Sequence, residues 1–299
     1  MFVVHLRISD RLIPPGHFPA FDRPGEHFKI EPIKSPLDGN VDLIEQELHL
    51  GSYVNIDNLS KLNEYDNFTI GGYFYPTFLP SEYVFPETID PFSPPSVDIA
   101  LLLENQTLFS RMRTDQKLGW AVQLDKEGQL IFAHGNGKEV KNYPTNLTIK
   151  TWDWSYIALG VDSNKKTVTV HLMETPWSAG DQFAAQKKSV TIQLENEFSQ
   201  SETLRIAALS AGKIEEGRAF SKPIDVFTGR IQDIRFFNKQ LTDTNLEELK
   251  NKNLTTELLK SQISYWNFSK GIGTGNVLDD GKLGLHGKAV NVPERAVRG

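Results

Sequence analysis

Apolar and polar residues alternate with a period of two in several stretches of the chain. These stretches cover residues 68–74, 118–124, 168–172 and 190–194. Successive side chains of a β-strand point to opposite faces, so each stretch predicts a strand with one buried face and one wetter face. Half-buried strands of this kind are typical of antiparallel sheets.

Short polar segments separate the predicted strands. Gly128 lies in the segment 124–130, where a tight turn needs a residue that tolerates a positive φ. Segments 134–138 and 161–167 are also rich in residues that form turns. Several short strands joined by such turns predict an all-β protein with a sandwich or jelly-roll fold.

One or two short helices interrupt the β pattern. Thr242 occupies a favourable N-cap position, acidic residues follow it, and Leu246 and Leu249 would share one helical face. We expect this short helix to pack against a sheet. A second short helix is indicated by Leu254, Leu258 and Leu259.

The composition narrows the classes of partner and site. Of the 299 residues, 39% are hydrophobic, which is enough for a packed core. The 32 Lys and Arg residues against 38 Asp and Glu residues give a net charge of −6. Because the chain lacks a basic cluster, we expect no nucleic-acid partner. Cysteine is absent, which excludes disulfides and thiolate metal sites.

Nothing in the sequence has the pattern of a signal peptide or a membrane span. The longest apolar run, residues 99–103, is far shorter than the roughly 20 residues that a spanning helix needs. We therefore expect no membrane partner and a cytoplasmic location.

Prolines divide the chain into two parts. Several prolines fall within residues 12–40, where they disfavour regular strand pairing. We therefore predict an N-terminal strand and Pro-rich segment over residues 1–40, followed by a β-sandwich over residues 41–299.

Residues that could carry catalysis are few. The seven histidines are scattered without the short spacing of a metal site, so we predict no metal ligand and no catalytic residue. The densest polar cluster combines Asp279, Asp280, His286, Glu294 and Arg295. It could act in acid–base chemistry, but an Asp-Asp-Gly sequence is more typical of a turn.

A pair of carboxylates is a second candidate for chemistry. Some glycosidases with a sandwich fold use two acidic side chains across the scissile bond. Glu195 and Glu197 are the nearest approach to such a pair, but they lie at the end of a predicted strand. A stand-alone hydrolase is therefore the least favoured hypothesis.

The five tryptophans raise the alternative of sugar binding. Trp177 lies in a predicted loop and is the best candidate for an exposed platform that stacks on a sugar ring. The other four, Trp120, Trp152, Trp154 and Trp266, lie in or beside predicted strands, where we expect burial.

Three segments resemble concanavalin A-like, laminin-G-type sandwiches. They are residues 68–76 (FTIGGYFYP), 152–162 (WDWSYIALGVD) and 227–241 (FTGRIQDIRFFNKQL). The resemblance implies an all-β jelly-roll sandwich with one or two short helices near residues 242–260. Gln232 departs from the family pattern, where an Asp is common, so we assign it no ligand role. This fold hosts many functions, and the resemblance indicates none of them.

The last part of the chain is more specific. Residues 266–273 (WNFSKGIG) and 277–299 (VLDDGKLGLHGKAVNVPERAVRG) resemble the segment that closes the N-terminal sandwich of N,N-dimethylformamidase large subunits. Residues 4–16 resemble the region before that sandwich. The resemblance covers the whole chain but only the first part of the family protein. It therefore suggests a separated or truncated N-terminal region.

The resemblance leads to a definite expectation about function. Members of this family hydrolyse N,N-dimethylformamide with a mononuclear iron held by tyrosine and carboxylate side chains in a C-terminal domain. We therefore expect this chain to hold no cofactor, to be non-catalytic alone, and to pack against a catalytic domain or subunit of the same enzyme. The alternative is a carbohydrate-binding, lectin-like module, and a glycan ligand and oligomerisation remain open.

Overall fold

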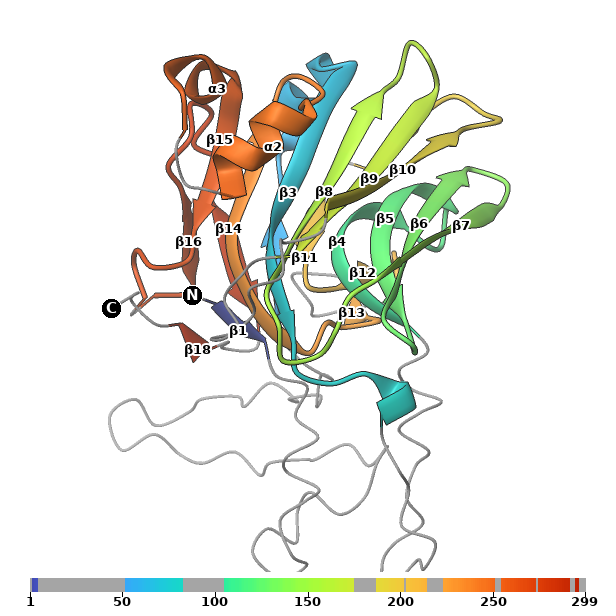
Figure 1. Ribbon diagram of the computed structural model, residues 1–299, viewed down its shortest axis with the longest axis horizontal. Helices are drawn as coiled ribbons and strands as arrows, with labels where there is room; N and C mark the ends of the chain where they lie inside the picture. The colour runs from blue at the N-terminus through green and yellow to red at the C-terminus, as the bar shows by residue number, and fades with distance from the viewer. Residues whose placement is uncertain are drawn as a thin grey trace, which may run out of the picture.

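The computed structural model describes most of the chain beyond residue 51. The described residues are 2–4, 52–82, 105–174, 187–201, 203–213, 223–250, 254–272, 274–290 and 294–295. Within them, two antiparallel β-sheets curl over each other and short helices pack on the outside of one sheet (Figure 1). The prediction of an all-β sandwich with one or two short helices is confirmed.

The first sheet, sheet A, runs in the order β10, β9, β8, β3 and β14. These strands are Lys187–Gln193, Thr167–Glu174, Ser155–Asp162, Asn67–Pro76 and Gly229–Phe237. The free side of β14 pairs at one end with β15 and at the other end with β1, which in turn pairs with β18. The strands β15, β1 and β18 are Gln262–Asn267, Phe2–Val4 and Glu294–Arg295.

The second sheet, sheet B, runs in the order β7, β6, β5, β4, β11, β2, β17 and β16. These strands are Val140–Thr148, Gln129–Asn136, Leu118–Asp125, Asn105–Arg113, Leu204–Ile206, Tyr53–Ile56, Gly287–Val290 and Asn276–Asp279. Two short strands, β12 (Leu209–Ser210) and β13 (Pro223–Ile224), extend it beside β4. Strand β16 also pairs with β15 of sheet A, so it connects the two sheets along one edge.

A layer of aromatic side chains fills the space between the sheets. The ring of Phe68 stacks on Phe236 with centroids 5.0 Å apart and lies 6.2 Å from Trp120. Phe109 and Phe74 continue the layer, and all five rings are nearly inaccessible to solvent. Burial of this apolar surface is the main stabilising contribution to the sandwich.

Two helices cover the outer face of sheet A. The helices are α2 (Asp243–Lys250) and α3 (Thr256–Ser261), and Figure 1 shows α2 lying across β14 and β3. Leu246 and Leu258 are fully buried in a hydrophobic cluster that also contains Tyr156 of β8. Strands β3 and β8 are consequently buried on both faces, which corrects the prediction of one wetter face for residues 68–74. Strands β5 and β9 are also buried along most of their length, so the same prediction was wrong for residues 118–124 and 168–172.

Local signals located the helices and turns correctly. The Thr242 hydroxyl accepts a hydrogen bond from the Asn245 amide at 3.3 Å, which confirms it as the cap of α2. Gly128 has a φ of 81° in the turn between β5 and β6. The second short helix is confirmed as α3, in which Leu258 is buried and the side chain of Leu259 is 45% exposed.

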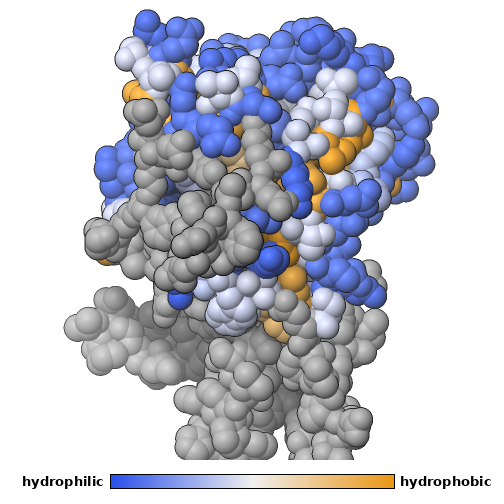
Figure 2. Space-filling view, viewed as in Figure 1, coloured by the Kyte–Doolittle hydropathy of each residue, from blue (hydrophilic) through white to orange (hydrophobic). Residues whose placement is uncertain are grey.

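Two further predictions, the domain boundary and the absence of a membrane span, can be compared only with the described residues. The boundary between residues 1–40 and 41–299 falls where the chain is not described, so the division stays a prediction; the strand at residues 2–4 belongs to sheet A. Among the described residues, none of the helices has the length and apolar character needed to cross a membrane. The described surface in the view of Figure 2 is mostly hydrophilic.

Two short 3-10 helices complete the described elements. Helix η3 (Leu59–Glu64) buries Leu59 and Leu62 beneath the sandwich core. Helix η4 (Pro80–Glu82) follows β3, where the Ser81 amide donates to the Lys126 carbonyl.

Candidate functional site

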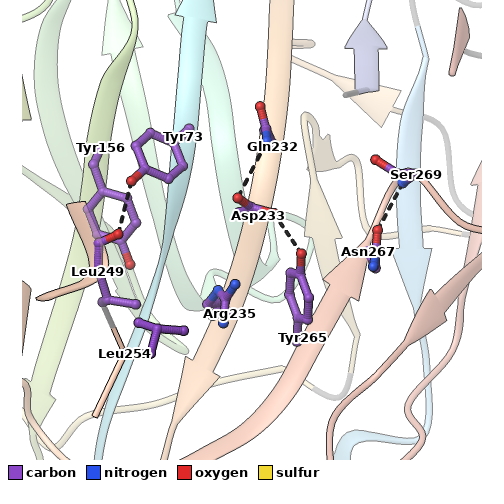
Figure 3. Close-up of a pocket in the computed structure, with 10 residues that line it drawn as sticks. All are labelled: Tyr73, Tyr156, Gln232, Asp233, Arg235, Leu249, Leu254, Tyr265, Asn267 and Ser269. Carbon is purple, nitrogen blue, oxygen red and sulfur yellow. Dashed lines mark hydrogen bonds between the residues drawn. The ribbon is translucent and has the colours of Figure 1, made fainter. Parts of the chain in front are cut away.

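A cavity lined by described residues lies on the outer face of sheet A. It has a volume of about 340 Å³ and lies between strands β3, β8, β14 and β15 on one side and Leu249 of α2 and Leu254 on the other (Figure 3). We call it the tyrosine-lined pocket. Its walls are Tyr73, Tyr156, Gln232, Asp233, Arg235, Leu249, Leu254, Tyr265, Asn267 and Ser269.

An irregularity in β14 brings adjacent side chains into this pocket. The pairing of β14 with β3 shifts register between Gln232 and Arg235, and Asp233 has a φ of 55°. In a regular strand, residues 232 and 233 would point to opposite faces. The bulge directs Gln232, Asp233 and Arg235 to the same cavity, as bulges near functional sites commonly do.

Asp233 and Arg235 supply the charges of the pocket. The Tyr265 hydroxyl donates to one carboxylate oxygen of Asp233 at 2.7 Å, and the Gln232 amide donates to the other at 3.4 Å. The guanidinium of Arg235 lies 4.0 Å from the centre of the Tyr265 ring and donates to Gln262 at 2.5 Å. Burial and the neighbouring carboxylate raise the pKa of Tyr265, so its phenol stays protonated and acts as a donor.

Tyr73 and Tyr156 form the opposite wall. Their rings meet edge to face with centroids 5.0 Å apart, and the Tyr73 hydroxyl donates to the Leu249 carbonyl at 3.2 Å. Tyr156 is only 1% exposed, and its hydroxyl has no hydrogen-bond partner among the described residues. Burial raises the pKa of Tyr156, so this hydroxyl is neutral and can donate a proton to a hydrogen bond.

The carboxylates near residue 280 hold the chain in place. Asp279 accepts hydrogen bonds from the amides of Tyr265, Gly281 and Leu285 at 2.7 to 2.8 Å. The Asp279 amide donates to His286 at 3.0 Å. These contacts are those of the turn that the Asp-Asp-Gly sequence predicted, and they occupy the carboxylate.

Asp280 is engaged on the surface beside this turn. Asn267 and Lys270 each approach its carboxylate at 2.9 Å. Burial raises the pKa of Asp280, but the bonds from Lys270 and Asn267 outweigh burial and hold it below its usual range. For Glu294 and Arg295 the structure describes the backbone of β18 and not the side chains, so the five-residue cluster is tested only in part.

The tryptophans divide between core and surface. Trp120 and Trp266 are fully buried, as expected, and Trp154 is half-buried. Trp152 is 66% exposed, which corrects the expectation of burial. It occupies the turn before β8 with a φ of 61°, and this backbone conformation directs the ring out beside Tyr75 at 6.3 Å. Trp177 lies outside the described residues, so its role as a sugar platform stays a prediction.

Comparison with curated proteins reveals one group of relatives. The chain is 25% identical over 287 residues to the N,N-dimethylformamidase beta subunit of Paracoccus aminophilus and 23% identical over 288 residues to that of an Alcaligenes species. The chain is a distant relative of N,N-dimethylformamidase beta subunits. Each match covers 92% of this chain, which spans about a third (34%) of the relatives' length. No protein-family model matches the chain.

Solved structures with a similar arrangement of strands are more remote. A putative carbohydrate binding protein from Bacteroides ovatus is 12% identical, with a TM-score of 0.49 over 82% of this chain and 58% of its own. The Ruminococcus gnavus IT-sialidase CBM40 gives 13% identity and a TM-score of 0.41 over 66% of this chain and 91% of its own. Domains LG4-5 of the mouse laminin alpha1 chain are 10% identical, with a TM-score of 0.38 over 64% of this chain and 40% of their own. The fold assignment rests on the strand pairings described above.

The paired carboxylates considered for a glycosidase do not form a site in the described structure. Glu195 and Glu197 follow β10 on the surface, where they form ion pairs with Lys141 and Lys166 respectively. Among the described residues, no cluster of three or more His, Asp or Glu side chains could hold a metal ion. His134, His171 and His286 are described and lie apart from the pocket walls, whereas the other four histidines fall outside the described ranges.

The residues of the pocket were not predicted from the sequence. Tyr73 and Tyr156 belong to predicted strands, but they lie far apart in the sequence and meet only because β3 pairs with β8. Asp233 enters the pocket through a bulge that no local pattern indicated. The alternation of Tyr73 with the inward-facing Phe74 was the one available signal, because it placed a large aromatic ring on the outer face.

Proposed function

We propose that this chain is the non-catalytic β-sandwich of an N,N-dimethylformamidase-like amide hydrolase, and that it packs against a catalytic domain or subunit of the same enzyme. One observation carries the proposal. The similarity to the beta subunits extends along 92% of this chain but covers only 34% of each relative. The proposal places the hydrolytic chemistry in the part of those relatives that this chain does not span, and it places the protein in the cytoplasm.

The tyrosine-lined pocket is a poor fit for the tyrosine- and carboxylate-bound iron that the resemblance implies. A tyrosine binds iron as a phenolate, yet burial raises the pKa values of Tyr156 and Tyr265. The guanidinium of Arg235 lies against the Tyr265 ring, where its charge opposes a metal cation. The pocket also offers one carboxylate, that of Asp233. We therefore route no step of amide hydrolysis through it.

The test compares the chain alone with the chain produced together with the coding region directly downstream of its own. Each preparation is reconstituted with ferrous iron and assayed for dimethylamine released from N,N-dimethylformamide. We expect release only from the second preparation, in which the two parts should co-purify in a fixed ratio or as one polypeptide. Iron-dependent release by the chain alone would overturn the proposal, as would a downstream region without amide hydrolase activity.

A further inference from the structure

We propose that the tyrosine-lined pocket binds a small neutral ligand rich in hydroxyl groups, about the size of a single sugar residue. The inference rests on the walls of the pocket. It does not depend on the assignment to an amide hydrolase, and the two proposals can fail separately.

The buried hydroxyl of Tyr156 is the first observation. Tyr156 is 1% exposed, yet its hydroxyl has no hydrogen-bond partner among the described residues. A buried polar group without a partner costs free energy, which a ligand that accepts a hydrogen bond would recover. Figure 3 shows this hydroxyl directed toward the space between Leu249 and Arg235.

Donors and acceptors converge on the same cavity. Among the described residues, the Arg235 guanidinium makes one hydrogen bond, to Gln262, so most of its five N–H donors are available. Asp233 accepts from Tyr265 and Gln232, which leaves lone pairs on both carboxylate oxygens. A hydroxyl group both donates and accepts, so a ligand with several hydroxyls can satisfy both kinds of partner.

The charges of the pocket select against ionic ligands. Arg235 and Asp233 contribute one positive and one negative charge within a single set of walls. An anion bound to Arg235 would face the Asp233 carboxylate, and a cation bound to Asp233 would face the guanidinium. A neutral ligand meets neither repulsion and can bond to both groups.

The size and the apolar walls set the remaining limits. A volume of about 340 Å³ lies at the lower end of the range for ligand pockets, roughly 300–1,000 Å³. Leu249, Leu254 and the ring of Tyr73 offer apolar surface to the carbon skeleton of a ligand. A wholly apolar ligand would leave Tyr156 and Asp233 without partners, so a compact polyol is the best match.

The experiment measures saturation-transfer NMR of the complete chain with a panel of neutral monosaccharides at millimolar concentration. We expect at least one sugar to bind. The variants Tyr156→Phe and Asp233→Asn should each weaken its Kd about tenfold and keep the shape of the side chain. The first removes a donor hydroxyl, and the second replaces a charged acceptor oxygen with an NH₂ donor. Tyr75→Phe is the matched control, since Tyr75 lies on the same face of β3 outside the pocket.

The Tyr156→Phe variant also keeps the test independent of folding. Its hydroxyl has no partner among the described residues, so its loss should leave the urea midpoint unchanged or raise it, and should not lower it. A panel without any bound sugar would overturn the proposal. So would sugar binding that survives in both pocket variants and is lost in Trp152→Ala, because that result assigns the sugar to the exposed tryptophan. Displacement of the sugar by formate or dimethylammonium would favour a charged ligand and also contradict the inference.

Discussion

A single carboxylate, that of Asp279, holds together three segments at the end of the sandwich. It accepts from the amide of Tyr265 in β15, from Gly281 in the following turn, and from Leu285 in the segment that precedes β17. The Leu285 carbonyl in turn accepts from the indole of Trp266 at 2.8 Å. These bonds connect Trp266, Leu285 and Asp279 with the turn at Gly281 in one hydrogen-bond network.

We expect Asp279→Asn to lower the free energy of unfolding by about 2 kcal/mol. The amide has a single acceptor oxygen, so its NH₂ group would face an amide donor that is now left unsatisfied. Urea denaturation of the two proteins measures the difference. Asp280→Asn is the matched control and should cost about 0.5 kcal/mol or less, because Asp280 is exposed to solvent. Equal losses for the two variants would contradict the structural role given to Asp279.

The predictability of single residues depended on how local their determinants are. The Asp-Asp-Gly turn was predictable, because the side chain and the glycine act within three positions. The exposure of Trp152 was not, because it follows from a left-handed backbone conformation in the turn before β8. The position of the Asp233 side chain in the pocket was not predictable either, because it is set by a bulge in the pairing of β14 with β3.

At the scale of elements, the short helices owe their position to capping and to one buried face. The hydroxyl of Thr255 accepts from the Leu258 amide at 3.3 Å and donates to the Glu248 carboxylate at 2.8 Å, so it caps α3 and ties it to α2. Leu258 is fully buried beneath it. A helix of this length is not stable alone and depends on such contacts.

We expect Thr255→Ala to destabilise the protein by about 1 kcal/mol, since it leaves an amide of the first helical turn without its cap. Thr255→Ser retains the hydroxyl, so its free energy of unfolding should fall by only a few tenths of a kcal/mol. Thermal and urea unfolding of the two variants provide the measurement. An alanine variant as stable as the serine variant would show that the cap contributes little in this context.

The elements themselves were largely predictable, but their environments were not. Alternation located strands such as β5 and β9 because each pattern lies within eight residues. The prediction that one face would be wet was wrong for β3, β5 and β9, which are buried along most of their length. For β3 the outer face lies under helices that follow more than a hundred residues later. The pocket depends on that coverage, so no single element could reveal it.

At the scale of the whole molecule, a buried histidine ring links sheet B to the segment after β10. His134 of β6 is 4% exposed and stacks between Phe132 and Phe198, with ring centroids 6.2 and 5.7 Å away. Its Nε2 accepts a hydrogen bond from the Ser199 amide at 3.1 Å. That bond requires an unprotonated Nε2, so the folded state favours the neutral imidazole, and burial lowers the pKa of His134.

This histidine should make the stability of the whole sandwich depend on pH. The pKa of His134 is lower in the folded state than its unfolded value of about 6.5, so between the two values the unfolded chain binds more protons. Its contribution is therefore complete above about pH 6.5 and is lost as the pH falls below that value. We expect the urea midpoint to decrease between about pH 7.5 and about pH 5.5, and to decrease less in His134→Gln, whose amide oxygen can still accept from Ser199. Because carboxylates titrate in both proteins, the difference between the two pH curves isolates the histidine. Parallel curves would mean that His134 has the same proton affinity in the folded and unfolded chains, contrary to its buried position between the two rings.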